Sequence, residues 1–175
     1  MKKLLTSFFL TLMAVLAIVP FAQIAKADDH NAFNYISNVA TPKLTTLYNK
    51  DDSNNFTAVK NRSLGAKTNW YTDMWIQSGK ETYLRVSTNE WARMSDVVAS
   101  LKLAASGEPH ITGVTVTANP AAIIYDDFGA KTIGRLEKGY AFKADQMGYF
   151  NNDTQHTYFR VGTNQWLSNA DVNPY

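Results

Sequence analysis

The chain has 175 residues, of which 13% are aromatic, and it contains no Cys. This length allows one ordinary domain or two small ones. The absence of Cys excludes disulfide frameworks, Cys-ligated zinc sites and a catalytic thiol. The formal net charge is +2, but an N-terminal segment that we expect to be removed holds three of the 17 basic residues and none of the 15 acidic ones. The remaining 14 basic residues against 15 acidic ones give −1, which excludes the basic field of a general nucleic-acid binder.

That N-terminal segment has the three parts of a secretory signal peptide. Lys2 and Lys3 form a cationic start, residues 4–20 are almost wholly apolar, and Ala25 and Ala27 supply small residues where a signal peptidase recognises them. The apolar run is short for a retained membrane span. We therefore predict cleavage after Ala27 and a secreted mature protein that does not span a membrane.

The next residues are expected to form a loose N-terminal arm over 28–38. Beyond it we predict two units, residues 39–97 and 116–175, joined by a linker over 98–115 that contains Ser, Gly and Pro. The apolar stretch 98–105 within this linker is expected to form one or two helical turns that need docking, since a short isolated helix is marginal.

The two units are proposed because the chain repeats itself. The segment 82–91 reads TYLRVSTNEW, the segment 157–166 reads TYFRVGTNQW, and an Asp-Val pair follows each Trp at the same spacing. Over the 16 aligned positions nine residues are identical at a constant offset of 75. Looser matches at an offset of 72 pair Leu64 with Leu136, Trp70 with Phe142 and Asp73 with Asp145. A fixed internal period indicates two copies of one structural unit.

Each unit has the pattern of short strands. Residues 44–48 and 122–125 are rich in β-branched and aromatic residues, and residues 82–86 and 157–161 alternate. Asn89 and Asn164 stand where a two-residue hairpin turn needs a left-handed conformation. Several short strands with polar turns in about 55 residues suggest a small barrel or a strongly curved sheet. The predicted fold class is therefore mainly β, with two small antiparallel barrel-like repeats, for which an SH3-like topology is a candidate.

These blocks resemble the bacterial surface-layer protein A domain, the paired wall-binding module of lactobacillar surface-layer and surface-layer-associated proteins. The second unit follows the family pattern closely, with Ile124-Tyr125, the segment 136–139, the segment 158–166 and Asp171-Val172. The first unit departs from it, since Ser87 replaces a Gly and Ala92 replaces a larger apolar residue. The resemblance implies a cell-wall protein of the S-layer type, attached non-covalently to anionic polymers such as teichoic or lipoteichoic acid, with S-layer proteins as further candidate partners.

The repeated residues have structural and functional interpretations. Trp91 and Trp166 are expected in the core, and Asp96 and Asp171 are expected to cap or close the last turn. Arg85 and Arg160 are open to three roles: solvation of a strand face, pairing with Asp96 or Asp171, and contact with ligand phosphate. Pairing is favoured, because the Arg-to-Asp spacing is kept in both units.

Polymer binding is assigned to residues near these arginines. Tyr83 and Tyr158 are interpreted either as face packing or as stacking partners for sugar rings, and Lys138 and Lys143 are candidate phosphate contacts. Charge favours the first unit and fidelity to the family pattern favours the second. We therefore expect a shared site near the junction of the two units.

Two other classes of function remain as alternatives. The protein could be a secreted interaction or adhesion protein for which wall binding is only delivery. It could also be a wall hydrolase built on paired carboxylates. His30, His110 and His156 have no metal-ligand spacing, and two short repeats leave no room for a catalytic domain. We therefore predict a non-enzyme that needs neither a metal nor a cofactor.

Overall fold

A computed structural model describes residues 29–30, 37–103, 111–150, 153 and 155–175. The predicted signal peptide with its cleavage site at Ala27 lies outside the described residues, as do most of the arm and part of the linker. The described chain is mainly β, as predicted, and all of its strand pairs are antiparallel.

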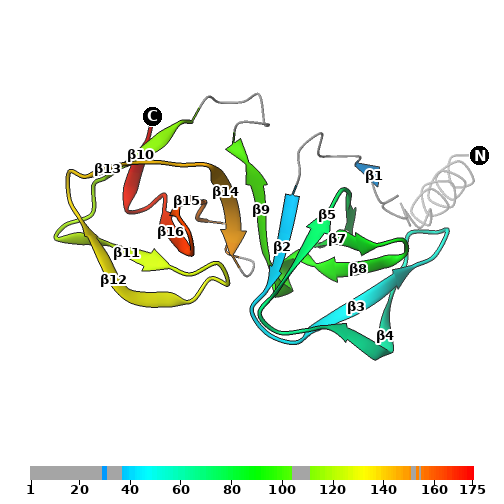
Figure 1. Cartoon of the computed structure of the whole chain (residues 1–175). Coiled ribbons are helices and arrows are strands. Elements are labelled where there is room, and N and C mark those ends of the chain that lie inside the picture. Colours follow the sequence, from blue (N-terminus) through cyan, green and yellow to red (C-terminus); the bar gives the residue numbers. More distant parts are fainter. Residues whose placement is uncertain (1–28, 31–36, 104–110, 151–152, 154) are drawn as a thin grey trace, which may run out of the picture.

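The strands form three sheets (Figure 1). The six-stranded sheet has the order β1 (Asp29–His30), β6 (Trp75–Ser78), β7 (Glu81–Ser87), β8 (Glu90–Arg93), β3 (Thr45–Lys50) and β4 (Phe56–Leu64). The eight-stranded sheet has the order β12 (Lys131–Glu137), β11 (Ala121–Tyr125), β16 (Gln165–Ser168), β15 (Tyr158–Gly162), β14 (Gln146–Phe150), β9 (Val98–Lys102), β2 (Ser37–Thr41) and β5 (Thr68–Thr72). The three-stranded sheet has the order β13 (Ala141–Lys143), β10 (Gly113–Val116) and β17 (Val172–Pro174).

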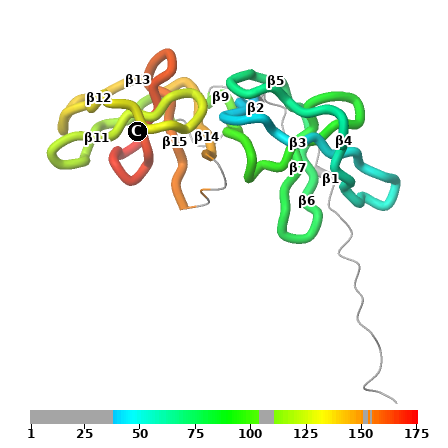
Figure 2. The backbone as a smooth tube through the Cα atoms, turned by 90° about the horizontal axis from the view of Figure 1, so that it is seen from below, coloured from blue at the N-terminus to red at the C-terminus, as the bar shows by residue number. Residues whose placement is uncertain are grey.

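The predicted barrel-like closure is not found. Among the described strands, no sheet closes on itself. The reason is the placement of β9, which pairs with β2 on one edge and with β14 on the other. We call the strands β1 to β9 the first half and the strands β10 to β17 the second half. The last strand of the first half therefore pairs with the second half, and the sheet of the first half stays open. Figures 1 and 2 show β9 and β14 side by side between the two halves.

The strand β9 also corrects the expectation for residues 98–105. Residues 98–102 form a strand where helical turns were predicted. All five residues of β9 pair with β14, from Val98 with Phe150 to Lys102 with Gln146, and four of them also pair with β2. Because hydrogen-bonded neighbours lie on both edges, tertiary pairing overrides a local preference for helix.

Strand pairing follows the same pattern in the two halves. In the first half Tyr48 pairs with Trp91, and in the second Tyr125 pairs with Trp166. A register shift follows Arg85 in the β7–β8 pair and another follows Arg160 in the β15–β16 pair. In each half the first long strand lies between two partners: β2 lies between β5 and β9, and β10 lies between β13 and β17.

The correspondence extends to β9 and β17 at an offset of 75. Val39 pairs with Ala99 in the first half, and Val114 pairs with Pro174 in the second. The outer edge of β9 carries β14, whereas β17 is the last strand of its sheet among the described residues. The corresponding outer edge is therefore paired with another strand in the first half and unpaired among the described strands in the second half.

The turn between β3 and β4 and the turn between β11 and β12 have the same hydrogen bonds. The Asp51 carboxylate accepts hydrogen bonds from the backbone N–H groups of Ser53 and Asn55, at 2.9 and 2.8 Å. The Asp126 carboxylate accepts from Phe128 and Ala130 at the same two distances. Short acidic side chains close turns in this manner. The fourth residue of each five-residue turn has a positive φ, which is 62° at Asn54 and 80° at Gly129.

The hairpin turns fall where the sequence places them. β7 ends at Ser87 and β8 begins at Glu90, while β15 ends at Gly162 and β16 begins at Gln165. Each hairpin therefore has a two-residue loop. Asn164 adopts the expected left-handed conformation, with a φ of 57°. The same expectation for Asn89 is wrong, because Asn89 has no positive φ.

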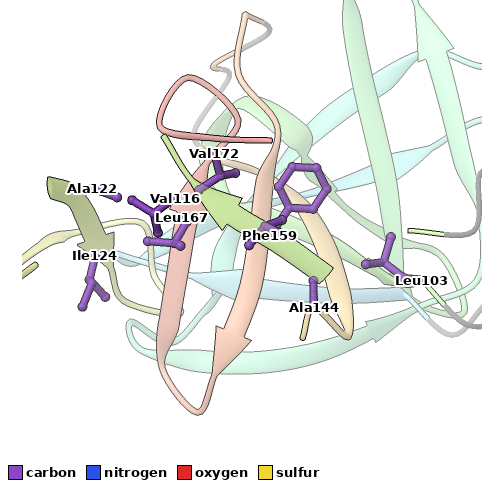
Figure 3. Packing of buried hydrophobic residues seen from close by; sticks show 9 residues of the cluster. Leu103, Val116, Ala122, Ile124, Ala144, Phe159, Leu167 and Val172 are labelled. Carbon is purple, nitrogen blue, oxygen red and sulfur yellow. The ribbon is translucent and has the colours of Figure 1, made fainter. Parts of the chain in front are cut away.

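Each half has an apolar core of its own. In the second half the core lies between β10, β11, β15 and β16, where Val116, Ile124, Phe159 and Leu167 pack together (Figure 3). In the first half the corresponding cluster contains Val39, Leu47, Leu64, Leu84, Ala92 and Val97. Trp91 and Trp166 are 2% and 3% exposed, in agreement with the expected packing role.

Candidate functional site

One arginine of each half forms a bidentate ion pair with an aspartate. Arg160 on β15 donates from Nε to Asp145 Oδ1 at 2.8 Å and from Nη2 to Asp145 Oδ2. Arg85 on β7 donates from Nε and Nη2 to the carboxylate of Asp73, at 2.8 and 2.6 Å. These hydrogen bonds lower the pKa of Asp145 and of Asp73 below the ordinary Asp value. Lys cannot reproduce this two-point geometry.

The arginine partners differ from those predicted. Arg160 was expected to pair with Asp171, and Arg85 with Asp96. Asp171 instead accepts a hydrogen bond from the backbone N–H of Ile123 at 3.3 Å, and Asp96 ends the 3₁₀ turn η1 (Met94–Asp96) and accepts one from Arg93 Nε at 3.2 Å. The reason is that Asp145 directly precedes β14, the strand paired with β15, so the carboxylate lies across from Arg160.

Gln146 adds a second partner for Arg160. Its side chain is buried, at 6% exposed, and it pairs across the sheet with Arg160. In the orientation that satisfies both ends of its amide, the oxygen accepts from Arg160 Nη1 and Nη2 at 3.1 and 2.8 Å and the nitrogen donates to Ser100 Oγ at 3.2 Å. A guanidinium has five N–H donors. Contacts with Asp145 and Gln146 use four of them, so one remains for a ligand.

A cleft of 200 Å³ lies beside Arg160 at the junction of the two halves. One wall comes from β2, β5 and β9 and the other from β14, β15, β16 and the β11–β12 turn. It is lined by Asn38, Ala40, Asn69, Val98, Ser100, Asp127, Gln146, Arg160 and Trp166. Three amides and one hydroxyl lie in this set beside the apolar Ala40 and Val98, and the charges of Arg160 and Asp127 balance. The cleft therefore offers hydrogen bonds of both kinds without a strong net field.

Two residues of the repeat signature shape this cleft from the side of the second half. Trp166 donates its indole N–H to Asp127 Oδ1 at 2.7 Å. The backbone N–H of Asp127 in turn donates to Asn164 Oδ1 at 2.8 Å. The β11–β12 turn is thereby tied to the β15–β16 hairpin. Asp127 is placed in the cleft wall by these contacts, and its role was not anticipated from the sequence.

The two tyrosines predicted as polymer contacts are buried. Tyr158 is 6% exposed and stacks on Phe150 with 3.9 Å between ring centroids, and Tyr83 is 8% exposed and stacks on Phe56 at 3.7 Å. Burial, with a hydrogen bond from the Tyr158 hydroxyl to Asp153 at 2.9 Å, raises the pKa of Tyr158. Their rings pack inside the two halves, which favours the packing interpretation over sugar stacking.

The two predicted lysines are exposed but stand apart from the cleft lining. Lys138 lies in the turn between β12 and β13, and Lys143 ends β13. Lys102 at the end of β9 was not predicted. It is exposed, and it lies close enough to Asp145 to help lower the pKa of that carboxylate, after the contribution of Arg160. Lys102 thus places a cationic group near the cleft.

The corresponding region of the first half is more open. A hollow of 340 Å³ beside Arg85 is lined by Tyr71, Asp73, Arg85, Val86, Ser87 and Thr88. The side chains of Arg85 and Asp73 are 30% and 42% exposed. Tyr71, on the edge strand β5, is 58% exposed. The sequence pattern singled out Arg85 and matched Asp73 with Asp145, but it did not mark Tyr71.

One sequence signal pointed to the correct arginine partners. Asp73 and Asp145 match each other at an offset of 72, as do Trp70 and Phe142. By contrast, Asn38, Asn69 and Ser100 line the junction cleft only because β2, β5 and β9 meet the second half. No local motif marks such residues.

No protein-family model matches the chain, and no curated protein matches it either. Within the described residues, no group of three or more His, Asp or Glu side chains is placed to hold a metal ion. No helix in the part of the chain that the structure describes is long and apolar enough to cross a membrane.

Proposed function

We propose that this protein is a secreted, non-covalent cell-wall-binding module, or a protein associated with an S-layer, that binds anionic wall polymers of the teichoic acid type. The observation that carries the proposal is the cleft at the junction, whose walls come from both halves and which contains the repeated Arg160. The secretory pattern of the N-terminal segment and the resemblance of the repeated blocks to a wall-binding domain support the same function.

We further propose that residues 39–97 and 116–175 are two copies of one curved, SH3-like unit. The shared register at Trp91 and Trp166, the two bidentate Arg–Asp pairs and the two identical Asp turns support this proposal. The pairing of β2 with β9 and of β10 with β17 also supports it, and extends the two copies to include β9 and all of β10, which lie largely in the predicted linker 98–115.

The chemistry of the junction cleft defines how the polymer is bound. Arg160 has a single N–H left, so it supplies one donor and not a two-point phosphate contact. Asn38 and Asn69 supply amides that both donate and accept, whereas the oxygen of Gln146 already accepts from Arg160. The hydroxyl-bearing part of the polymer occupies the cleft, and its phosphates meet the exposed Lys102, Lys138 and Lys143.

The test uses the whole chain, because the eight-stranded sheet runs through both halves and separation would cut it. The double variant Asn38→Ala/Asn69→Ala removes two polar groups of the cleft wall. Retention on purified walls should fall about tenfold, since two neutral hydrogen bonds are worth about 1–3 kcal/mol together. The matched control Asn61→Ala/Asn173→Ala changes two exposed strand residues outside the cleft and should retain full binding. Equal retention by both variants would remove the junction cleft from the proposal.

A second measurement separates wall attachment from simple secretion. Intact cells are extracted with concentrated lithium chloride, which weakens charge-dependent contacts. Recovery of the protein in the extract supports non-covalent wall attachment. Recovery only from the culture medium contradicts it and favours a free secreted interaction protein.

A further inference from the structure

The first half carries an exposed aromatic side chain beside its Arg–Asp pair. Tyr71 lies on β5, the last strand of the eight-stranded sheet, with 58% of its surface exposed, and its neighbour Trp70 is 37% exposed. Tyr71 lines the 340 Å³ hollow together with Asp73 and Arg85, and its phenol is close enough to contribute to the raised pKa of Arg85, after the contribution of Asp73. Because successive side chains of a strand point to opposite faces, Trp70 faces away from the hollow, and Tyr71 supplies its aromatic ring.

The ion pair with Asp73 holds the Arg85 guanidinium in place and leaves some of its N–H donors for a ligand. Asp73 uses two of the five N–H donors of Arg85, from Nε and Nη2. In the second half Gln146 occupies two more donors of Arg160, but 72 residues earlier the first half has Met74, which carries no amide. Arg85 therefore keeps donors that Arg160 has lost. The hydroxyls of Ser87 and Thr88 complete the lining.

The charge of the hollow argues against an anionic ligand. The Arg85 cation is neutralised at 2.6 Å by Asp73, and the other lining residues are uncharged. At an offset of 72 the second half has Lys143 where the first half has Tyr71. The first half thus presents a flat aromatic face where the second presents a cation, so the two halves select different parts of a ligand.

We propose that Tyr71, Arg85, Asp73, Ser87 and Thr88 form a subsite for an uncharged sugar ring. The ring packs its C–H face on Tyr71, and its hydroxyls accept from Arg85 and donate to Asp73, as expected where an aromatic face adjoins donors and acceptors held in place. This inference goes beyond the junction cleft, because the subsite lies on the first half alone and does not require binding of a charged polymer.

The experiment titrates the full secreted chain with uncharged oligosaccharides of glucose, galactose and N-acetylglucosamine, and separately with inorganic phosphate. Tyrosine and tryptophan resonances are followed by NMR. Saturable binding of one of the sugars, with shifts at Tyr71 and no effect of phosphate, is the expected result. Binding of phosphate but not sugar at these resonances would overturn the proposal. So would the absence of binding by every sugar up to about 50 mM, because even weak sites show millimolar affinity.

Three variants assign the binding to the hollow. Tyr71→Ala should weaken sugar binding about tenfold, Tyr71→Phe should keep it because the ring face remains, and Arg85→Lys should weaken it because the fixed donors are lost. Tyr140→Ala is the matched control, since Tyr140 is 59% exposed on the second half. Equal sugar affinity of Tyr71→Ala and Tyr140→Ala would overturn the proposal.

Two further readouts separate this inference from its alternatives. Sedimentation of Tyr71→Ala and of the unaltered chain should agree, whereas self-association that is lost in Tyr71→Ala would identify a protein interface instead. Wall retention of Asn38→Ala/Asn69→Ala reports on the junction cleft independently. Failure of that retention test with sugar binding intact would remove the junction cleft from the proposed function and leave the sugar subsite standing.

Discussion

Trp166 donates its indole N–H to Asp127 at 2.7 Å, and this contact joins the core of the second half to the wall of the junction cleft. Trp91, the matching residue of the first half, is equally buried, but its indole N–H meets no acceptor among the described residues. The difference makes Asp127 a structural residue of the second half alone.

Replacing Asp127 by Ala should destabilise the protein by about 1–3 kcal/mol, because the buried Trp166 donor loses its acceptor. The control is Asp52→Ala at the matching position of the first half, 75 residues earlier, where the side chain is exposed. Its effect should stay within about 0.5 kcal/mol. Urea unfolding measures both, and equal losses would show that the indole contact has no net value.

The pairing of Arg160 with Asp145 can be tested by a double-mutant cycle. Arg160→Ala and Asp145→Ala should show a coupling of about 0.5–1 kcal/mol, a modest value because Asp145 is 62% exposed. Arg160→Ala and Asp171→Ala should instead add. Thermal unfolding of the two cycles decides the partner, and coupling with Asp171 alone would contradict the structure.

The two Arg–Asp pairs predict how stability depends on pH. Because their folded pKa values lie below the ordinary value of about 3.9, Asp73 and Asp145 contribute stability that is fully present above that value. This stability is lost as pH falls through the folded pKa values. Between about pH 5 and about pH 2.5, on either side of the ordinary Asp pKa, the Tm of the variant Asp73→Asn/Asp145→Asn should therefore fall less than that of the unaltered chain. A parallel loss in both proteins would show that other groups control acid unfolding.

Gly148 lies on β14, where this strand pairs with β9, and its lack of a side chain is predicted to allow the close approach of the two strands. A Cβ at Gly148 would lie 3.0 Å from the Ala99 carbonyl oxygen and 3.2 Å from Trp166 Cζ3. Gly148→Ala should therefore cost about 1–3 kcal/mol through overpacking. Gly65→Ala is the control, because its nearest neighbour would be Thr68 Cγ2 at 3.4 Å. Calorimetry compares the two, and a smaller loss in Gly148→Ala would show that the contact of β14 with β9 yields without strain.

The proposed contact of Lys138 and Lys143 with wall phosphates predicts that wall retention depends on salt. Lys138→Gln/Lys143→Gln should weaken retention at low salt, and the difference should shrink as salt rises because phosphate contacts are screened. Lys43→Gln/Lys80→Gln removes two exposed cations from the first half and serves as the control. Identical salt curves for the two double variants would exclude Lys138 and Lys143 as specific phosphate contacts.

The sequence predicted what depends on local pattern. The two hairpin turns, the β class and the burial of Trp91 and Trp166 follow from alternation and from residues that favour turns. The partner of Arg160 did not follow, because sequence spacing favoured Asp171 while the pairing of β14 with β15 brings Asp145 across.

The junction was beyond the reach of local pattern for the same reason. Residues 98–102 have no strong strand signal of their own, and they become a strand because β2 and β14 lie on either side. Asn38 and Gln146 meet in one cleft through that strand. Contacts between residues far apart in the sequence decide such a site, and a single sequence does not reveal them.

Pro174 has a consequence for how the protein behaves at high concentration. Ala99, which matches it at an offset of 75, presents a backbone N–H on a strand that recruits β14, whereas Pro174 has no N–H to give. Proline on an outer strand prevents an incoming chain from extending the sheet. The edge through which the first half pairs with the second half is thus blocked in the second half, which disfavours aggregation of chains along this edge.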